Sequence, residues 1–461
     1  MRAIPIFAAV ASMIGVWIIA FQLSKDPADR LLLAGATNDA QHTDSPKTVG
    51  STCRLIGQHA QTYDCEIVGN PNADRWPEPT AEHAYARSVW DMETATIGGK
   101  GERIYFGGGD WGLNQGPVPI WSLYWQKPKE ENANIRIAQE QPVYGEAIEF
   151  FREIDGRLYV PDIDPKDPWA YGNIYALDND GWFKYRNLEH AVHVFDVIGF
   201  QGAIVASAGV VENSNGFAGL YRSTDNGVSW MRLPVSHGES RDAYRYWRMA
   251  EFGEGLFVAQ SSARNGYWTL DKNWHLQFHD TDLFPDMGDA DLRLTVSRAV
   301  PFGGDVLYTP KLDRMPINPQ LRDFPLAPIY QSNVHFRNWW DKIIAAWSFT
   351  HRNLYRLTQN GNVDIVKIPG RPHINDVLIL EGEVYVLGTS FDAENYQAII
   401  LSSSDLENWN EVQKIETQAI AYSFEYLDGE WFLGLAADGM TDNNISSGEI
   451  IRIYSNVSGA N

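Results

Sequence analysis

Beyond its first few dozen residues, the chain alternates short apolar runs with turns rich in Gly and Asp, and these recur as one unit. Each unit contains a strand, a turn of two or three residues and a strongly apolar second strand, which is the pattern of a β-hairpin. Most units continue with a third strand, a polar turn and a fourth strand. Eight hairpins are recognisable, and they start at Ser88, Glu146, His193, Arg245, Thr295, His335, His373 and Tyr422.

Four short strands repeated at roughly 40 to 50 residues predict an all-β fold, the β-propeller. A closed ring buries each sheet against the next, whereas a lone four-stranded sheet exposes both faces and edges. The unit at Thr295 lacks a clear fourth strand, so rings of seven and of eight four-stranded blades both stay open. The last unit ends at "EIIRIYS", and we expect a segment near residues 76–87 to supply its fourth strand.

The N-terminal segment, residues 1–23, is apolar from Ile4 to Leu23 and long enough to span a bilayer as a helix. We favour an uncleaved membrane anchor that leaves the bulk of the chain periplasmic or extracellular, and a cleaved signal peptide is the alternative. Residues 24–50 are polar and contain Pro and Asp, which indicates a flexible tether. Residues 51–84 form a lead-in to the propeller, which we expect at residues 85–461.

The lead-in holds the two cysteines of the chain, Cys53 and Cys65. A lone nearby pair in an exported chain predicts a disulfide, because a metal site would need further ligands at the right spacing. The segments "CRLIG" and "TYDCEIVG" are the expected strands of a hairpin that this disulfide staples.

The net charge of the chain limits the classes of partner that it can bind. With 37 Lys and Arg against 59 Asp and Glu, the net charge is −22. Nucleic-acid binding needs a basic footprint, so that class is excluded. The excess of acid indicates a soluble extracytoplasmic part that touches the membrane only through residues 4–23. No motif indicates a cofactor.

One polar turn, "STDNGVSW", lies where the third and fourth strands of the His193 unit meet. Its pattern is Ser-x-Asp-x-Gly-x-x-Trp, formed by Ser223, Asp225, Gly227 and Trp230. The carboxylate can accept hydrogen bonds from the N–H groups of the turn, the glycine permits positive φ, and the indole packs beneath. Ser403–Trp409 and Thr269–Trp274 look like degenerate copies of the turn. We expect a structural role for this motif.

The turn resembles the Asp-box, or bacterial neuraminidase (BNR) repeat, of sialidase-like propellers, sortilin-like receptors and photosystem assembly factors. That resemblance implies a β-propeller in which the motif lies away from the central site. It covers the repeats but not the sialidase catalytic set, since the only Arg-x-Ile-Pro of the chain, Arg2–Pro5, lies in the N-terminal apolar segment.

A candidate site emerges when the hairpins are aligned. The first strand of each unit opens with a residue, mostly polar, and has a second polar residue three positions later. If this strand is innermost, these residues ring the central channel, where closed β-folds hold their pockets. Residues three apart point to opposite faces of a regular strand, so both line the channel only where the strand is irregular. The candidates are Asp91, Glu149, His193, Asp196, Arg248, Arg298, His335, His373, Asp376 and Glu425.

Several chemistries fit such a ring. Facing carboxylates suit glycoside cleavage, histidines with aspartates suit a metal, and arginines suit an anionic ligand. The plainer alternative is that the acids pair with the arginines in a polar channel. We predict no resident metal, and a membrane-anchored propeller that binds, and in one version processes, a glycan or similar surface polymer. The alternative function is a non-enzymatic scaffold or assembly factor that holds protein partners, including membrane proteins.

Overall fold

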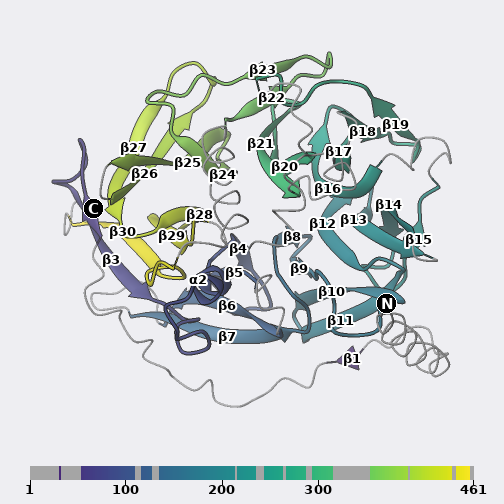
Figure 1. Ribbon diagram of the computed structural model, residues 1–461, viewed down its shortest axis with the longest axis horizontal. Coiled ribbons are helices and arrows are strands. Elements are labelled where there is room, and N and C mark those ends of the chain that lie inside the picture. Colours follow the sequence, from purple (N-terminus) through teal and green to yellow (C-terminus); the bar gives the residue numbers. More distant parts are fainter. Residues whose placement is uncertain are drawn as a thin grey trace, which may run out of the picture.

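The computed structural model describes residues 31–32 and 53–456, except residues 110–115, 127–133, 213–214, 235–242, 263–265, 287–292, 315–352, 393–394 and 439–442. These residues form a seven-bladed β-propeller in which each blade has four antiparallel strands (Figure 1). The first strand of every blade lies nearest the centre of the ring (Figure 1). The predicted all-β propeller is confirmed, and the number of blades is seven.

The first four blades follow the chain without interruption of order. The first contains β4 (Asp91–Thr96), β5 (Glu102–Gly107), β6 (Val118–Trp125) and β7 (Ile135–Val143). The second contains β8 (Arg152–Ile154), β9 (Arg157–Pro161), β10 (Tyr171–Asp178) and β11 (Gly181–Glu189), with β1 (Leu31–Leu32) added to its outer edge. The third contains β12 (His193–Phe200), β13 (Ala203–Glu212), β14 (Asn215–Ser223) and β15 (Met231–Arg232), and the fourth β16 (Ala243–Phe252), β17 (Gly255–Ser262), β18 (Tyr267–Leu270) and β19 (Leu276–His279).

The last three blades bring the ring back to its start. The fifth contains β20 (Arg293–Phe302), β21 (Asp305–Arg314), β22 (Tyr355–Leu357) and β23 (Val363–Ile365). The sixth contains β24 (His373–Leu380), β25 (Glu383–Asp392), β26 (Asn395–Ser403) and β27 (Asn410–Thr417), with β2 (Arg54–Leu55) outside them. The seventh contains β28 (Ile420–Leu427), β29 (Glu430–Ala436), β30 (Ile450–Ser455) and β3 (Tyr63–Gly69).

An N-terminal strand closes the ring, but not the one expected. The outer strand of the seventh blade is β3, which pairs with β30, so purple and yellow ribbons lie side by side in Figure 1. The prediction that residues 76–87 supply this strand is wrong. Residues 81–87 form the helix α2 (Ala81–Arg87) instead, with Thr80 as its N-cap. Its last residue, Arg87, is buried and donates hydrogen bonds to the carbonyls of Trp76 and Asn444.

The predicted disulfide between Cys53 and Cys65 is confirmed, but the hairpin around it is not. The two cysteine-bearing segments do not pair with each other: β2 pairs with β27 of the sixth blade, and β3 pairs with β30 of the seventh. The disulfide therefore links the outer edges of two neighbouring blades.

The unit that opens at Thr295 is a complete blade, because β22 and β23 supply its outer strands after the stretch 315–352. The eighth hairpin, predicted to start at His335, falls within that stretch and outside the described residues. The apolar run Ile4–Leu23 also lies outside them. In the part of the chain that is described, no helix has the length and apolar character needed to cross a membrane.

Local rules explain why the blades form. The turn between β12 and β13 has positive φ at both central residues, 50° at Gln201 and 66° at Gly202, which matches the right-handed twist of a two-residue hairpin. Apolar side chains then meet between blades. Ile174 and Phe183 of the second blade pack with Ala206 and Tyr221 of the third in one buried cluster. Such clusters fill the interfaces between blades, which leaves the polar inner strands to meet at the axis.

Candidate functional site

The inner strands are irregular where the candidate residues require it. In β12 the register shifts between Val194 and Asp196, so that His193 pairs with Gly209 and Asp196 pairs with Ser207. The two partners on β13 are two positions apart, and therefore His193 and Asp196 lie on the same face. The same shift occurs in β20 for Thr295 and Arg298 and in β24 for His373 and Asp376.

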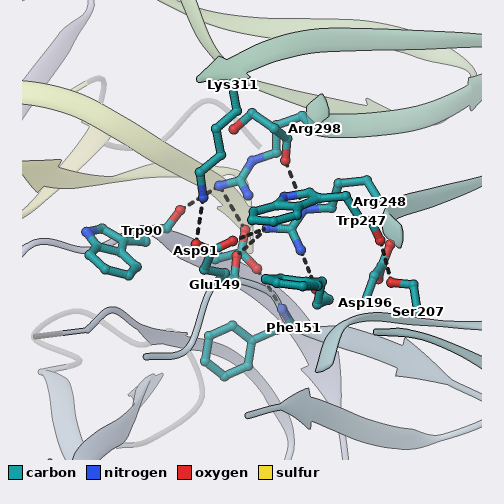
Figure 2. Close-up of polar contacts among 12 residues, drawn as sticks. Trp90, Asp91, Glu149, Phe151, Asp196, Ser207, Trp247, Arg248, Arg298 and Lys311 are labelled. Atoms are coloured by element: carbon teal, nitrogen blue, oxygen red, sulfur yellow. Dashed lines mark hydrogen bonds and ion pairs between the residues drawn. The ribbon is translucent and has the colours of Figure 1, made fainter. Parts of the chain in front are cut away.

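Arg298 joins three blades at the axis. Its Nε lies 2.7 Å from Oδ1 of Asp376 in the sixth blade, and its Nη2 lies 3.0 Å from Oδ1 of Asp91 in the first. Nη2 also donates to the carbonyl of Trp90 at 2.6 Å (Figure 2). All three charged side chains are buried. One guanidinium thus serves two carboxylates, in the charge-assisted geometry that arginine favours.

This shared guanidinium leaves its two carboxyl groups with shifted pKa values. Burial raises the pKa of Asp91 to about 7, and repulsion from Asp376 adds to the effect while Arg298 opposes it. Burial likewise raises the pKa of Asp376. Burial alone would lower the pKa of Arg298, but the two carboxylates raise it, so the arginine stays charged.

Arg248 forms a second centre. Its Nη2 lies 3.2 Å from Oε2 of Glu149, which belongs to the segment that leads into β8 (Figure 2). Its Nε donates to the carbonyl of Ser297 at 3.0 Å, and its Nη1 donates to the carbonyl of Phe195. The fourth blade is thereby tied to the second, third and fifth by one buried side chain.

Glu149 has a second cationic partner. Lys311 Nζ, on β21, lies 2.6 Å from its Oε1. Although burial of Glu149 acts to raise its pKa, Lys311, Arg248 and Arg245 together lower it. The pKa of Glu149 is therefore shifted downward, in the opposite direction from the pKa values of Asp91 and Asp376.

The inner-strand aspartates also bind the backbone of the next blade. Oδ2 of Asp196 accepts from the N–H of Met249 at 2.8 Å, and Arg152 lies 3.3 Å from the same oxygen. Asp91 accepts from Phe151 N–H at 2.7 Å, and Asp376 accepts from Phe424 N–H at 3.2 Å. We call these three contacts the aspartate clips. They give the recurring acid at this position a structural role.

Two glutamates meet on neighbouring inner strands. Glu425 Oε2 accepts from Thr94 Oγ1 at 2.9 Å, which places it beside β4. Burial raises the pKa of Glu425 well above its ordinary value, and repulsion from Glu93 raises it further. Burial also raises the pKa of Glu93 to about 8, against the opposing charge of Arg152. Glu93 was not among the predicted residues, although its position two residues after Asp91 on a strand puts it on the same face.

A different group of side chains lies where the inner strands begin, and we call it the channel mouth. Its members are His193, Asp164, Arg245, Phe195, Trp247 and Lys311. Nε2 of His193 lies 3.2 Å from Arg245 Nη2, and its Nδ1 lies 3.2 Å from Oδ1 of Asp164. Because an arginine N–H can only donate, Nε2 accepts, and in the neutral ring Nδ1 carries the proton. Phe195 stacks on Trp247 with ring centroids 3.9 Å apart, and Lys311 Nζ is 5.0 Å from the centroid of Trp247.

The structure thus brings most of the candidate residues together around the axis. Arg298 with Asp91 and Asp376 forms one buried group of ion pairs, Arg248 with Glu149 forms a second, and Asp196 pairs with Arg152. Glu425 lies close enough to Asp376 for the two charges to repel. His193 is at the mouth, and His373 starts β24 opposite Thr389. His335 lies outside the described residues. Within those residues, no group of three or more His, Cys, Asp and Glu side chains is arranged to hold a metal ion.

The turn "STDNGVSW" lies between β14 and β15, far along its blade from the inner strand. Ser223 Oγ accepts from Gly227 N–H at 2.8 Å, and Asp225 Oδ1 accepts from Ser229 N–H at 2.8 Å. Trp230 Nε1 donates to the carbonyl of Gly227, which has a φ of 90°. Asp405 accepts from two backbone N–H groups in the corresponding turn before β27. All these bonds stay within the turns.

Sequence reasoning missed a pair of aromatic residues near the channel mouth. Trp169 is 55% exposed and Tyr144 is 46% exposed, and they are the only aromatic side chains among the exposed large hydrophobic residues that the structure describes. Trp169 lies in the connection from β9 to β10, which also carries Asp164, and Tyr144 directly follows β7. Neither position differs in type from the many buried aromatics of the chain, so no pattern marked them.

Comparisons with known proteins find similar chains among solved structures only. No family model matches it, and no curated protein does. Among solved structures it is similar to the β-propeller domain of the trilobed protease of Pyrococcus furiosus, at 10% identity over 76% of this chain and 92% of that one, with a TM-score of 0.40. It is also similar to a PL25 ulvan lyase, at 12% identity over 87% and 96%, TM-score 0.41. A third is the Bombyx mori GH32 β-fructofuranosidase, at 13% identity over 83% and 96%, TM-score 0.36.

The neighbours of this propeller therefore include hydrolases and lyases, several of which act on glycans. At such low identity the function has to be argued from the residues of this chain.

Proposed function

We propose that this chain is a membrane-anchored extracytoplasmic propeller that binds a glycan or similar surface polymer at the channel mouth. The observation that carries the proposal is the partial exposure of His193 and Lys311 at this opening, 15% and 21% of their side chains, with Arg245 and the stacked rings of Phe195 and Trp247 buried beside them. Cationic and imidazole N–H groups at the opening of a closed β-fold suit the hydroxyl and acidic oxygens of a sugar chain.

The proposal is binding and not cleavage in the described channel. Hydrolysis of a glycoside needs two carboxyl groups that face an accessible substrate. Here Asp91 and Asp376 both bond Arg298, and Glu149 bonds Arg248 and Lys311. These acids are buried and already paired, so the channel centre holds the blades together.

The cellular setting belongs to the same proposal. The apolar run Ile4–Leu23 supports an anchor, and the disulfide Cys53–Cys65 supports an oxidising compartment outside the cytoplasm. We also assign Ser223, Asp225, Gly227 and Trp230 to an Asp-box, on the basis of the hydrogen bonds that close the turn.

The filled channel favours a second candidate function. A ring whose centre is occupied by Arg248, Arg298 and their partners offers a rigid face, which suits a scaffold for protein partners. In this version the exported propeller holds a partner by its face and performs no chemistry.

A glycan array probed with the full chain, together with a hydrolase-substrate screen, tests both candidates. We expect binding to a subset of glycans, no turnover, and at least fivefold weaker binding by Lys311→Met. Glu149→Gln and Asp376→Asn, both checked for folding by thermal unfolding, separate the channel mouth from the centre. Glu149→Gln weakens the ion pair with Lys311 and should change the glycan affinity, whereas Asp376→Asn should not. Absence of any glycan binding overturns the proposal, and capture of exported proteins by the same chain would then favour the scaffold.

A further inference from the structure

The exposed aromatic pair Tyr144 and Trp169 has an unusual position for side chains of its size. Trp169 exposes 55% of its surface and Tyr144 exposes 46%, whereas Trp247 and Trp268 are almost wholly buried. A large ring left in water forgoes the free energy that its burial would supply. Exposed aromatic surface beside polar groups is typical of a binding site.

Local contacts hold the two rings where they are. Trp169 Nε1 donates to the carbonyl of Pro165 at 3.2 Å, which satisfies the polar edge of the indole inside its own loop. Lys166 N–H donates to the carbonyl of Tyr144 at 2.8 Å, so the loop is fastened to the corner between the first and second blades. The indole N–H is thus already used, and its apolar faces are what the loop presents to a ligand.

Basic side chains border the same corner. Lys184 forms an ion pair with Asp167, and its Nζ is 5.5 Å from the ring centroid of Tyr144. Arg186 Nη2 donates to the carbonyl of Pro168 at 3.0 Å, and its guanidinium lies 5.8 Å from the ring of Tyr171. Lys184 is buried and paired with Asp167, and the partly exposed Arg186 lies beside the loop that carries Trp169.

The corner is continuous with the channel mouth. Asp164, five positions before Trp169, lies 3.2 Å from His193, and Ile163 forms an isolated β-bridge with His193. The aromatic pair and the mouth with its Arg245 and Lys311 therefore lie on one face of the ring.

We propose that Trp169 and Tyr144 form a subsite for a pyranose unit of an acidic polysaccharide, whose carboxylate or sulfate groups bind the neighbouring cations. The inference rests on the proposed function and names its ligand class. A pyranose ring presents a patch of C–H groups that stacks on an aromatic face, while its equatorial oxygens reach the polar groups around it. The basic border selects acidic sugars over neutral ones.

Affinity electrophoresis of the full chain tests the subsite. The probes are polygalacturonate, alginate and chondroitin sulfate, each paired with its esterified, carboxyl-reduced or desulfated form. We expect at least one acidic polymer to retard the chain at least tenfold more strongly than its neutralised form, with an effect that weakens as salt rises. Trp169→Ala should weaken that binding roughly tenfold, because the stacked face is lost.

Two variants separate binding from folding. Trp169→Phe loses the hydrogen bond to Pro165 but keeps a ring, so we expect it to retain most of the affinity. Met231→Ala removes a side chain of equal exposure, 55%, on the outer strand of the third blade, and should change nothing. Equal binding of acidic and neutral forms, or an unaffected Trp169→Ala, overturns the inference and leaves the proposed function standing. Failure to bind any glycan at all overturns both.

Discussion

Arg298 of the fifth blade lies 3.0 Å from Asp91 of the first, although two blades separate them along the closing side of the ring. The same guanidinium bonds Asp376 of the sixth blade at 2.7 Å. Contacts of this kind cross the axis and are independent of the strand hydrogen bonds. The ring is therefore closed at its rim by the pairing of β3 with β30, and its blades are joined at the centre by the ion pairs of Arg298.

Removal of the positive charge of Arg298 should strongly destabilise the ring. In Arg298→Met, Asp91 and Asp376 remain buried without their cation, and loss of one partner from a buried ion pair costs about 3–5 kcal/mol. Equilibrium unfolding in urea measures this. Lys272→Met is the control, because its ion pair with Glu254 is exposed and is worth less than about 1 kcal/mol. Equal effects of the two variants would contradict a structural role for Arg298.

The glutamate pair predicts a pH dependence. The pKa of Glu93 is raised to about 8 and that of Glu425 is raised well above its ordinary value, so between about pH 4.5 and pH 8 the folded chain holds protons that the unfolded chain has released. The free energy of unfolding contributed by this pair therefore falls as pH rises through that window.

Glu425→Gln should remove most of this dependence, since an amide can still accept from Thr94 Oγ1 and has no proton to lose. We expect the variant to match the native chain at pH 4.5 and to exceed it by roughly 1–2 kcal/mol at pH 8. Urea unfolding at several pH values checks this, with the exposed Glu254→Gln as the control. A constant difference between the variant and the native chain across the pH range would refute the raised pKa of Glu425.

The disulfide should contribute to stability without being essential to the fold. Replacement of Cys53 and Cys65 by Ser removes a link across a sequence separation of 12, which is worth about 3 kcal/mol in the chain-entropy model. Because β3 still pairs with β30, we expect a folded ring with a lower urea midpoint. The native chain in dithiothreitol should show the same shift, and an unchanged midpoint would count against the link.

The polar turn should affect stability alone. Asp225→Ala removes the acceptor for Ser229 N–H and Oγ, which in this solvent-exposed turn is worth about 1 kcal/mol. Hydrogen bonds to the carboxylate lower the pKa of Asp225 despite its partial burial, so the contribution is present above pH 4 and lost in acid. Asp225→Asn keeps one acceptor oxygen and should lose less. A change in glycan affinity in either variant would show that the turn takes part in binding and is not purely structural.

Sequence patterns predicted the ring because its signals are local. The Gly turns and apolar strand pairs act within one hairpin, and the polar positions of Asp196 and Asp376 recur once in each unit. The closing strand was missed because β3 and β30, which pair with each other, lie at opposite ends of the sequence. No residue pattern within β3 indicates which strand it pairs with. The partners of Arg298 and the exposure of Trp169 depend in the same way on how distant blades meet.

The disulfide also determines how the ring responds to force. A pull on the chain before Cys53 passes through the sulfur atoms directly to Cys65, so β2 and residues 54–64 are shielded from tension. The force is instead resisted by the rest of β3, Glu66 to Gly69, which would have to slide along its partner strand β30. A propeller held by its N-terminal segment would then begin to open at this four-residue stretch of strand pairing. Its resistance to force would come from these few hydrogen bonds and from the ion pair between Glu66 and Arg452.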